Sequence, residues 1–230
     1  MRDVSAGTLR AVRAAIEFVE SLGDGLVLGL GSGRTAETLI RELAERPGSR
    51  TGLIREVVAT SLQSEVTAAS LNFRTISPLS GSIPDIYVDS FDQSDGKGNV
   101  VKGGGGALAR EKILMFSSRR VLMIGDETKL RERIDMPIPV EVIPFGCSYF
   151  KRFAESRGWR PAMRTGAGKF GPVVTDNGNI LFDVSVPVVD DPIRLEVEMK
   201  MIPGVVEAGI FPNRGYKILV GRSDGSVTQL

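Results

Sequence analysis

Short apolar runs alternate with helical patterns along the first 125 residues, and this alternation constrains the fold more than any other feature. Apolar residues recur at helical spacing around residues 9–19, 36–43, 62–69 and 113–114. The runs typical of buried strands are residues 26–28, 57–59, 86–88 and 121–125. Strands that alternate with helices pair in parallel, and the helices cover both faces of the sheet. The sequence therefore predicts an α/β fold with a doubly wound, mostly parallel sheet.

A different pattern begins near Pro137. A strand is predicted at residues 140–143 and a helix at 149–155, and strands at 205–211 and 216–220 close the chain. We interpret this region as a second, smaller α+β domain, inserted before the chain returns to the first sheet. The expected boundaries are residues 1–133 plus 208–230 for the α/β domain and residues 134–207 for the smaller α+β domain.

Local signals give finer expectations within this framework. Ser61 precedes a helical pattern and is expected to cap it. The dipeptide Asn177-Gly178 lies between two apolar runs, which predicts a β-hairpin with a type I′ turn. Asp191-Pro192 is expected to open a helix that turns Ile193 and Val197 toward the core.

The 230 residues include no histidine and only one cysteine, and their net charge is +1. Histidine-based triads and histidine-ligated zinc are therefore excluded. Cys147 has no partner for an internal disulfide, which fits a cytoplasmic protein, and we expect it to be a small buried apolar residue. A charge near zero gives no global field that would recruit nucleic acid. No apolar stretch reaches the length of a membrane span, and the amino terminus lacks a signal-peptide core.

The central segment contains an unusual cluster of charges and glycines. Lys102 is followed by four glycines and then by a helical pattern with an early glutamate, Glu111. Asp89 and Asp92 lie just upstream, after the strand run. Such a glycine run loses much chain entropy on ordering, so it suits a loop whose N–H groups approach an anionic ligand closely. The alternative is a flexible surface loop, but without histidine any proton transfer must use carboxylates, lysine, tyrosine or water.

A second glycine cluster, residues 29–35, joins a strand to a helix. It fits neither the dinucleotide fingerprint, because Arg34 replaces the last glycine, nor a Walker A loop. Its N–H groups, the hydroxyls of Ser32 and Thr35, and Arg34 would suit one phosphate monoester. The alternative is a tight turn in which Thr35 caps the helix. Ligands of parallel sheets bind beyond the carboxyl ends of the strands, where both glycine clusters and Asp89 are expected.

In their order and spacing, these motifs resemble those of ribose-5-phosphate isomerase type A nearly end to end. The matching segments are residues 29–36, 89–93, 102–112, 126–129, 139–144, 174–179 and 204–206. Any one motif is weak, but seven in order over some 170 residues are specific. The chain departs from the family pattern at Arg34 in place of serine, at Ser90-Phe91 in place of Gly-Ala, and at Gln93 in place of glutamate.

The resemblance implies an aldose–ketose isomerase of the non-oxidative pentose phosphate pathway. It would interconvert ribose 5-phosphate and ribulose 5-phosphate through an enediolate. The implied catalytic residues are Glu111 as general base, Lys102 as the cation beside the enediolate oxygen, and Asp89 and Asp92 for ring opening and proton movement between oxygens. The implied substrate-binding residues are Ser32, Gly33, Arg34, Thr35, Ser90, Phe91, Gly103, Gly104, Gly105 and Lys129.

No metal or other cofactor is expected, because Lys102 would supply the positive charge. The only partners expected are the sugar phosphate and further copies of the chain, in a dimer or tetramer; neither nucleic acid nor a membrane is expected. Two alternatives stay open. One is a non-catalytic sugar-phosphate sensor domain, and the other is a related amino-sugar phosphate deaminase or coenzyme A transferase.

Overall fold

The computed structural model describes residues 4–166 and 168–230, and its internal contacts group the chain into two compact units. Unit 1 contains the residues up to Phe91, Arg110–Lys129 and Gly215–Leu230. Unit 2 contains Asp92–Ala109 and Leu130–Arg214. This division differs from the boundary expected from sequence, because the segment after β3 packs with the antiparallel strands. Residues 92–109 pair there through two short strands, which the sequence pattern did not indicate.

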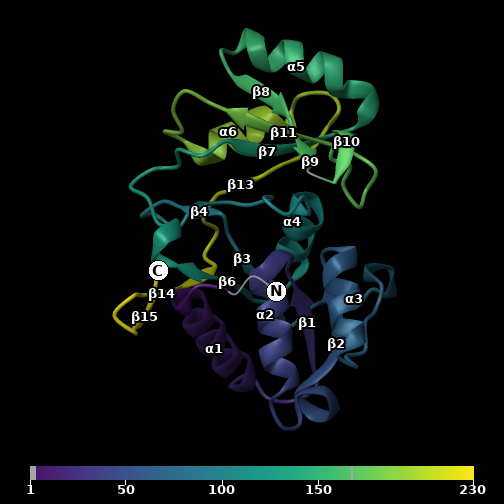
Figure 1. Ribbon diagram of the computed structural model, residues 1–230, viewed down its shortest axis with the longest axis vertical. Helices are drawn as coiled ribbons and strands as arrows, with labels where there is room; N and C mark the ends of the chain where they lie inside the picture. Colours follow the sequence, from purple (N-terminus) through teal and green to yellow (C-terminus); the bar gives the residue numbers. More distant parts are fainter. Residues whose placement is uncertain (1–3, 167) are drawn as a thin grey trace. The chain divides into compact units, whose positions relative to one another are not determined.

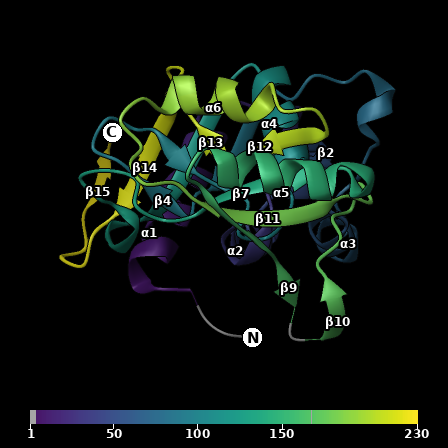
Figure 2. The ribbon, with the colours of Figure 1, turned by 90° about the horizontal axis from the view of Figure 1, so that it is seen from above.

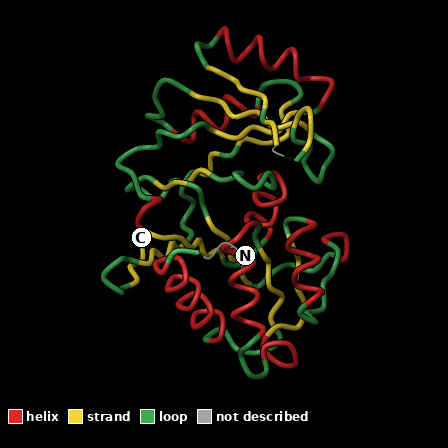
Figure 3. The backbone as a smooth tube through the Cα atoms, in the orientation of Figure 1, coloured by secondary structure: helices red, strands yellow, loops and turns green. Residues whose placement is uncertain are grey.

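Unit 1 is built on a six-stranded sheet in the order β15-β14-β6-β3-β1-β2, drawn in Figures 1 and 3. All neighbours are parallel except β14 and β15. The strands are β1 (Leu26–Leu30), β2 (Ile54–Ala59), β3 (Ile86–Ser90), β6 (Val121–Asp126), β14 (Lys217–Gly221) and β15 (Val227–Gln229). The doubly wound, mostly parallel sheet predicted from sequence is confirmed.

Four helices accompany this sheet. They are α1 (Ala6–Glu20), α2 (Gly33–Ala44), α3 (Leu62–Ser70) and α4 (Leu108–Ser117); the first two residues of α4 are grouped with unit 2. Short helical turns occur at Ser49–Leu53, Pro78–Ser80 and Glu127–Lys129. Side-chain caps start two of the helices: Ser5 accepts from the Thr8 N–H at α1, and Ser61 accepts from the Ser64 N–H at α3, as expected for Ser61.

The two faces of the sheet pack against different helices. Leu28 and Ile86, with their neighbours on the same face, share one buried core with the apolar sides of α1 and α2. Strand alternation turns Gly29 and Tyr87 to the opposite face, where a side chain at Gly29 would meet both Tyr87 and Leu114 of α4. The absence of a side chain at Gly29 therefore lets α4 lie close to the sheet.

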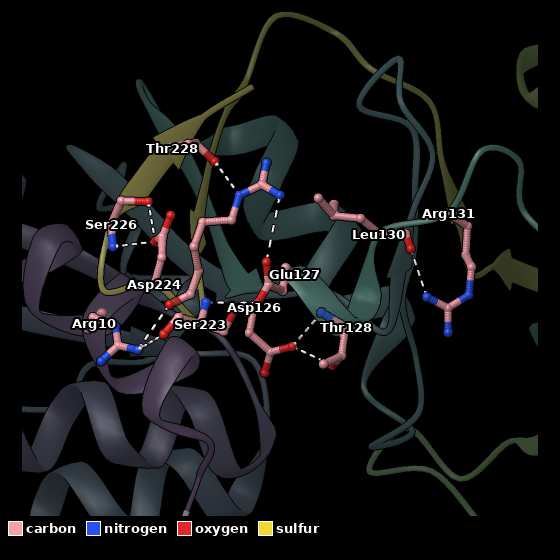
Figure 4. A network of polar contacts seen from close by, with 11 residues as sticks. Arg10, Asp126, Glu127, Thr128, Leu130, Arg131, Ser223, Asp224, Ser226 and Thr228 are labelled. Atoms are coloured by element: carbon pink, nitrogen blue, oxygen red, sulfur yellow. Dashed lines mark hydrogen bonds and ion pairs between the residues drawn. The ribbon is translucent and has the colours of Figure 1, made fainter.

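Asp126, at the end of β6, ties α1 to the sheet through a buried carboxylate, and Figure 4 draws its contacts with Thr128. Its Oδ2 accepts hydrogen bonds from the hydroxyls of Ser5 at 2.6 Å and Thr8 at 2.7 Å. Its Oδ1 accepts from the backbone N–H of Thr128 at 3.0 Å and from the Thr128 hydroxyl. Burial alone would raise the pKa of Asp126, but the bonds from Ser5, Thr128 and Thr8 outweigh it and lower that pKa to about 2.

We expect Asp126→Asn to destabilise unit 1 in a pH-dependent way. A carboxyl whose pKa is lowered on folding stabilises the folded state above its unfolded pKa of about 3.9, and this contribution disappears as pH falls through the folded pKa. The gap in free energy of unfolding between wild type and Asp126→Asn should be about 2 kcal/mol at pH 7 and should narrow between about pH 4 and pH 2. Urea unfolding at several pH values measures it, and a gap that stays constant would disprove the contribution.

Unit 2 contains a four-stranded antiparallel sheet in the order β12-β7-β11-β8. The strands are β7 (Ile138–Val142), β8 (Arg160–Met163), β11 (Ile180–Ser185) and β12 (Val205–Ala208). Two helices pack on it, α5 (Cys147–Ser156), which follows a turn at Pro144–Gly146, and α6 (Pro192–Lys200). The ring centroids of Phe150 on α5 and Phe182 on β11 lie 5.0 Å apart within the core. The second α+β fold is therefore confirmed.

The expected orientation of α6 is wrong. The helix does begin at Pro192, with Asp191 accepting from the Arg194 N–H. However, Ile193 is 57% exposed and Val197 is 54% exposed, whereas Leu195 and Met199 face the core. Both pairs have the same spacing of four residues, so helical periodicity alone did not decide between the two faces.

Unit 2 also holds two smaller sheets. One has the order β13-β5-β4 and is formed by β4 (Gln93–Ser94), β5 (Val100–Val101) and β13 (Ile210–Phe211). The other is a narrow hairpin of β9 (Thr165–Gly166) and β10 (Lys169–Pro172), visible in Figure 2.

The turn at Asn177-Gly178 is not the expected type I′. A type I′ turn needs positive φ at both central residues, and Gly178 has a φ of +80° while Asn177 is not among the residues with positive φ. Buried Glu141 explains the difference, because its Oε1 accepts from Thr175 at 2.9 Å, Asn177 at 3.0 Å and Asn179 at 2.8 Å. The turn is shaped by the side chains that bind this carboxylate, including that of Asn177, rather than by the backbone preferences of the Asn-Gly pair.

Candidate active site

The first group of predicted site residues lies in unit 1, where β1 and β3 end side by side. Leu30 pairs with Val88, so Gly31 and Asp89 are neighbours at the carboxyl ends of the two strands. A Cβ on Gly31 would lie 2.0 Å from Oδ1 of Asp89. Glycine is therefore required at position 31 so that the aspartate can turn across the end of β1.

Asp89 is held rigidly, with only 1% of its surface exposed. Its Oδ1 accepts from the N–H groups of Ser90 at 2.7 Å and Ser32 at 3.3 Å. Its Oδ2 accepts from the Tyr87 hydroxyl. The carboxylate is thus fixed by donors from its own strand and from the loop after β1.

Tyr87 is the residue of this group that sequence reasoning missed. It was assigned only to an apolar strand run, although residues 87 and 89 of one strand necessarily share a face. Burial, followed by the negative charges of Asp89 and Glu111, raises the pKa of Tyr87 well above 10. The hydroxyl therefore stays protonated at physiological pH and keeps donating to Asp89.

Glu111 lies in the first turn of α4 and is 3% exposed. The Ser32 hydroxyl donates to its Oε1 at 2.5 Å. Ser32 occupies the N-cap position of α2, but its side chain makes no capping hydrogen bond there. The hydroxyl that would ordinarily cap α2 instead holds the glutamate, so the loop after β1 contacts both buried carboxylates, Asp89 and Glu111.

The remaining residues of the predicted phosphate loop surround the amino terminus of α2. Gly33 has a φ of +79°, a conformation that L side chains rarely adopt. Thr35 is buried, and Arg34 is exposed. N–H groups at the start of a helix attract anions, and an exposed arginine adds charge at the same place.

Lys129 and Phe91 contact each other in unit 1. The Lys129 ammonium donates to the Phe91 carbonyl at 2.6 Å and lies 5.5 Å from the centroid of its ring. The ring is 1% exposed and lies where a side chain on Gly125 would have to be. Phe91 is therefore a packing residue, and any contact with a substrate would go through its backbone. The neighbouring Ser90 is half-buried.

The second group of predicted site residues lies in unit 2. Lys102 directly follows β5, is 3% exposed, and its Nζ lies 5.9 Å from the centroid of the Phe211 ring. Its backbone N–H donates to the Gly209 carbonyl at 2.8 Å. Position 209 also requires glycine, because a Cβ on Gly209 would lie 2.2 Å from the Lys102 carbonyl oxygen.

The glycine loop begins directly after this lysine. Gly103 is buried with a φ of +104°, whereas Gly104 and Gly105 are exposed. The N–H of Gly104 donates to Oδ2 of Asp92 at 2.7 Å. This N–H was expected to face a ligand, and in the structure it holds the second aspartate instead.

The structure thus brings the predicted residues together within each unit. In unit 1, Ser32 contacts both Asp89 and Glu111, and Lys129 contacts Phe91. In unit 2, Asp92 contacts the loop that Lys102 begins.

Half-buried Cys147 lies at the start of α5, and burial raises the pKa of its thiol, so it remains a thiol near neutral pH.

Comparison with known proteins identifies the family. The family described as "Ribose 5-phosphate isomerase A (phosphoriboisomerase A)" matches residues 56–225. The chain is 44% identical over 224 residues to ribose-5-phosphate isomerase A of Archaeoglobus fulgidus, covering 96% of this chain and 97% of that protein. The chain belongs to the ribose 5-phosphate isomerase A family. The protein of the same name from Methanothermobacter thermautotrophicus is 42% identical over 213 residues, covering 92% of this chain and 93% of that protein.

Solved structures of the family have the same fold. Ribose 5-phosphate isomerase A from Methanocaldococcus jannaschii matches with a TM-score of 0.88 and 37% identity, over 96% of this chain and 97% of that one. A D-ribose-5-phosphate isomerase in complex with phospho-erythronic acid matches with a TM-score of 0.90 and 34% identity, over 97% and 96% of the two chains. Among the described residues of this member of the family, no helix is long and apolar enough to span a membrane.

Proposed function

We propose that this chain interconverts ribose 5-phosphate and ribulose 5-phosphate. Its membership of the isomerase family supports this function, and one contact in the structure carries the chemical argument. Glu111 is a buried carboxylate whose Oε1 is bound by Ser32, at the start of the helix that is proposed to bind phosphate. Ser32 therefore lies between the proposed base, Glu111, and the proposed phosphate site at the start of α2. This arrangement suits proton transfer on a phosphorylated sugar.

Glu111 is the proposed base. Its carboxylate removes the proton from C2 of the open-chain aldose, and the electrons of that C–H bond form the C1–C2 double bond of an enediolate. The negative charge moves to the oxygen on C1. Glu111 then returns the proton to C1, while the proton of the C2 hydroxyl is transferred to the negatively charged oxygen on C1, which leaves a ketone at C2 and a hydroxyl at C1. One carboxylate serves both carbons, so no histidine is needed.

Lys102 and the glycine loop are proposed to stabilise the enediolate. A buried ammonium group interacts strongly with the negative charge that develops in the transition state. Its surroundings are already ordered, so little reorganisation is needed during the reaction. Asp89 and Asp92 are proposed to open the sugar ring and to move protons between its oxygens. We propose that no metal or cofactor takes part, since Lys102 supplies the required positive charge.

The substrate phosphate is proposed to bind at the start of α2. The phosphate-binding residues would be Ser32, Gly33, Arg34, Thr35 and Lys129, with Ser90 and the loop residues Gly103, Gly104 and Gly105 contacting other parts of the substrate. A phosphomonoester fits this place because the helix dipole and the exposed Arg34 side chain both favour a dianion.

We expect Arg34→Ser to raise KM, about tenfold, with kcat little changed. The phosphate is remote from C1 and C2, so contacts with it are nearly equal in the ground state and the transition state. Steady-state kinetics at low and high ionic strength measure the effect, and the penalty should shrink at high salt because exposed charges are screened. A KM that is unchanged at low salt would show that Arg34 does not bind phosphate.

A coupled assay of the purified protein tests the function itself. We expect turnover of ribose 5-phosphate and none of glucosamine 6-phosphate or of an acyl-coenzyme A donor. Binding of ribose 5-phosphate without turnover would support the alternative sensor function, and turnover of either of the other substrates would support the corresponding related enzyme.

We also propose that the chain is cytoplasmic, on the basis of its single cysteine, and that it forms a homo-oligomer. An apolar cavity of about 600 Å³ opens on unit 1, lined in part by Leu79, Ile83 and Ile113. These side chains are 96%, 54% and 66% exposed. Large apolar side chains gathered around one cavity are typical of an interface, and sedimentation of the purified protein would give the number of copies.

A further inference from the structure

Arg164, directly after β8, contacts the glycine loop within unit 2. Its Nη1 donates to the carbonyls of Gly103 at 2.8 Å and Gly104 at 3.2 Å. Its Nε and Nη2 donate to Oδ2 and Oδ1 of Asp183 at 2.9 and 2.5 Å. The bidentate pair with Asp183 fixes the plane of the guanidinium, and the third nitrogen is left to hold the loop.

The Arg164 side chain is not needed to hold its own strand. The Arg164 N–H donates to the Leu181 carbonyl at 2.8 Å, and its carbonyl accepts from the Val173 N–H at 2.8 Å. Strands β8 and β11 are in register from Arg160 to Met163 without it. The ion pair with Asp183 engages only Nε and Nη2 of the guanidinium, so it does not account for the contacts that Nη1 makes with the loop. The contacts with the loop are therefore the distinctive feature of this side chain.

Arg164 contacts two consecutive peptide groups of the glycine loop, which is also closed by a hydrogen bond from the Gly106 N–H to the Gly103 carbonyl at 3.0 Å. In the Gly103–Gly104 peptide, the carbonyl binds Arg164 and the N–H binds Asp92 at 2.7 Å. In the Gly104–Gly105 peptide, the carbonyl binds Arg164, so the N–H of Gly105 points the opposite way, as it must in a trans peptide. Within the described residues, no acceptor is assigned to this Gly105 N–H.

We propose that Arg164 is a positioning residue for the isomerisation: it sets the glycine loop so that the Gly105 N–H donates to the enediolate oxygen and the Gly104 N–H holds Asp92. This inference rests on the proposed function, because it names how the loop beside Lys102 acquires its catalytic geometry. Glycine is the residue type that most needs such an external restraint, since its backbone loses the most conformational freedom on ordering.

The test compares Arg164→Ala with Arg160→Ala, which removes the same charge from an exposed position on β8, the strand just before Arg164. Arg164→Ala should lower kcat by about 10²-fold, the typical effect of misplacing a reacting group, with KM for ribose 5-phosphate little changed. Guanidinium ion added at millimolar concentration should restore part of the kcat. Arg164→Lys, which keeps the charge but concentrates it on a single nitrogen, should have a kcat between those of wild type and the alanine variant. Arg160→Ala should behave like wild type in every measurement.

Two readouts that do not depend on turnover separate this inference from the proposed function. In Arg164→Ala, the amide signals of Gly104 and Gly105 should shift and the Gly104 N–H should exchange faster with solvent. Affinity for phospho-erythronic acid, whose carboxylate resembles the charged enediolate, should fall.

If wild type does not convert ribose 5-phosphate, the proposed function fails. If kcat, these amide signals and the affinity are all unchanged in both Arg164 variants, the role of Arg164 is disproved while the function stands.

Discussion

Glu111→Gln is expected to abolish most turnover of ribose 5-phosphate while the protein still folds and binds this substrate. The amide keeps the size of the side chain and can still accept the Ser32 hydroxyl at Oε1, which lies 2.5 Å away in the wild type. It has no basic oxygen able to remove the C2 proton, however. Loss of a general base typically costs about 10²–10⁴-fold, and we expect the upper part of that range because Glu111 would serve both carbons.

The matched control is Glu17→Gln, on an exposed position of α1, which should retain wild-type kcat. Binding of phospho-erythronic acid measured by calorimetry would show that the Glu111 variant still recognises a phosphorylated ligand. A kcat near that of wild type in a correctly folded Glu111→Gln protein would prove that another group removes the proton.

Lys102→Ala is expected to lower kcat by about 10²–10³-fold, the usual cost of removing one stabiliser of a developing oxyanion. Because Lys102 is 3% exposed and its ammonium lies near the Phe211 ring, alanine would also leave a gap in unit 2. Lys102→Met fills that gap without a charge, so it should be as slow as the alanine variant but more stable. A rise in KM with kcat intact in both variants would mean that Lys102 only binds the substrate.

Features of this protein that depend on local sequence were predictable. Strand and helix patterns alternate over the first 125 residues, which was enough to predict the parallel sheet. The position of Gly31 after a strand placed it beside Asp89, because neighbouring parallel strands end at the same edge. Ser61 caps its helix as expected, since capping depends on residues within one turn.

Features that depend on tertiary partners were not predictable. The turn at Asn177 takes its shape from Glu141, which is 36 residues away in the sequence. The buried face of α6 is chosen by the sheet beneath it, since Ile193 and Leu195 carry equally apolar side chains. The bond from Gly104 to Asp92 and the role of Tyr87 likewise follow from side chains that only the fold brings into contact.

Incorporation of solvent deuterium tests the central claim most directly. Wild-type protein and ribose 5-phosphate would be brought to equilibrium in D₂O, and the sugars followed by proton NMR. Transfer through a carboxylate base predicts that ribulose 5-phosphate forms and that deuterium accumulates at its C1 and at C2 of the remaining ribose 5-phosphate, because the proton on Glu111 exchanges with solvent over many turnovers. Absence of ribulose 5-phosphate, or its formation with the original hydrogen fully retained after many turnovers, would contradict the account.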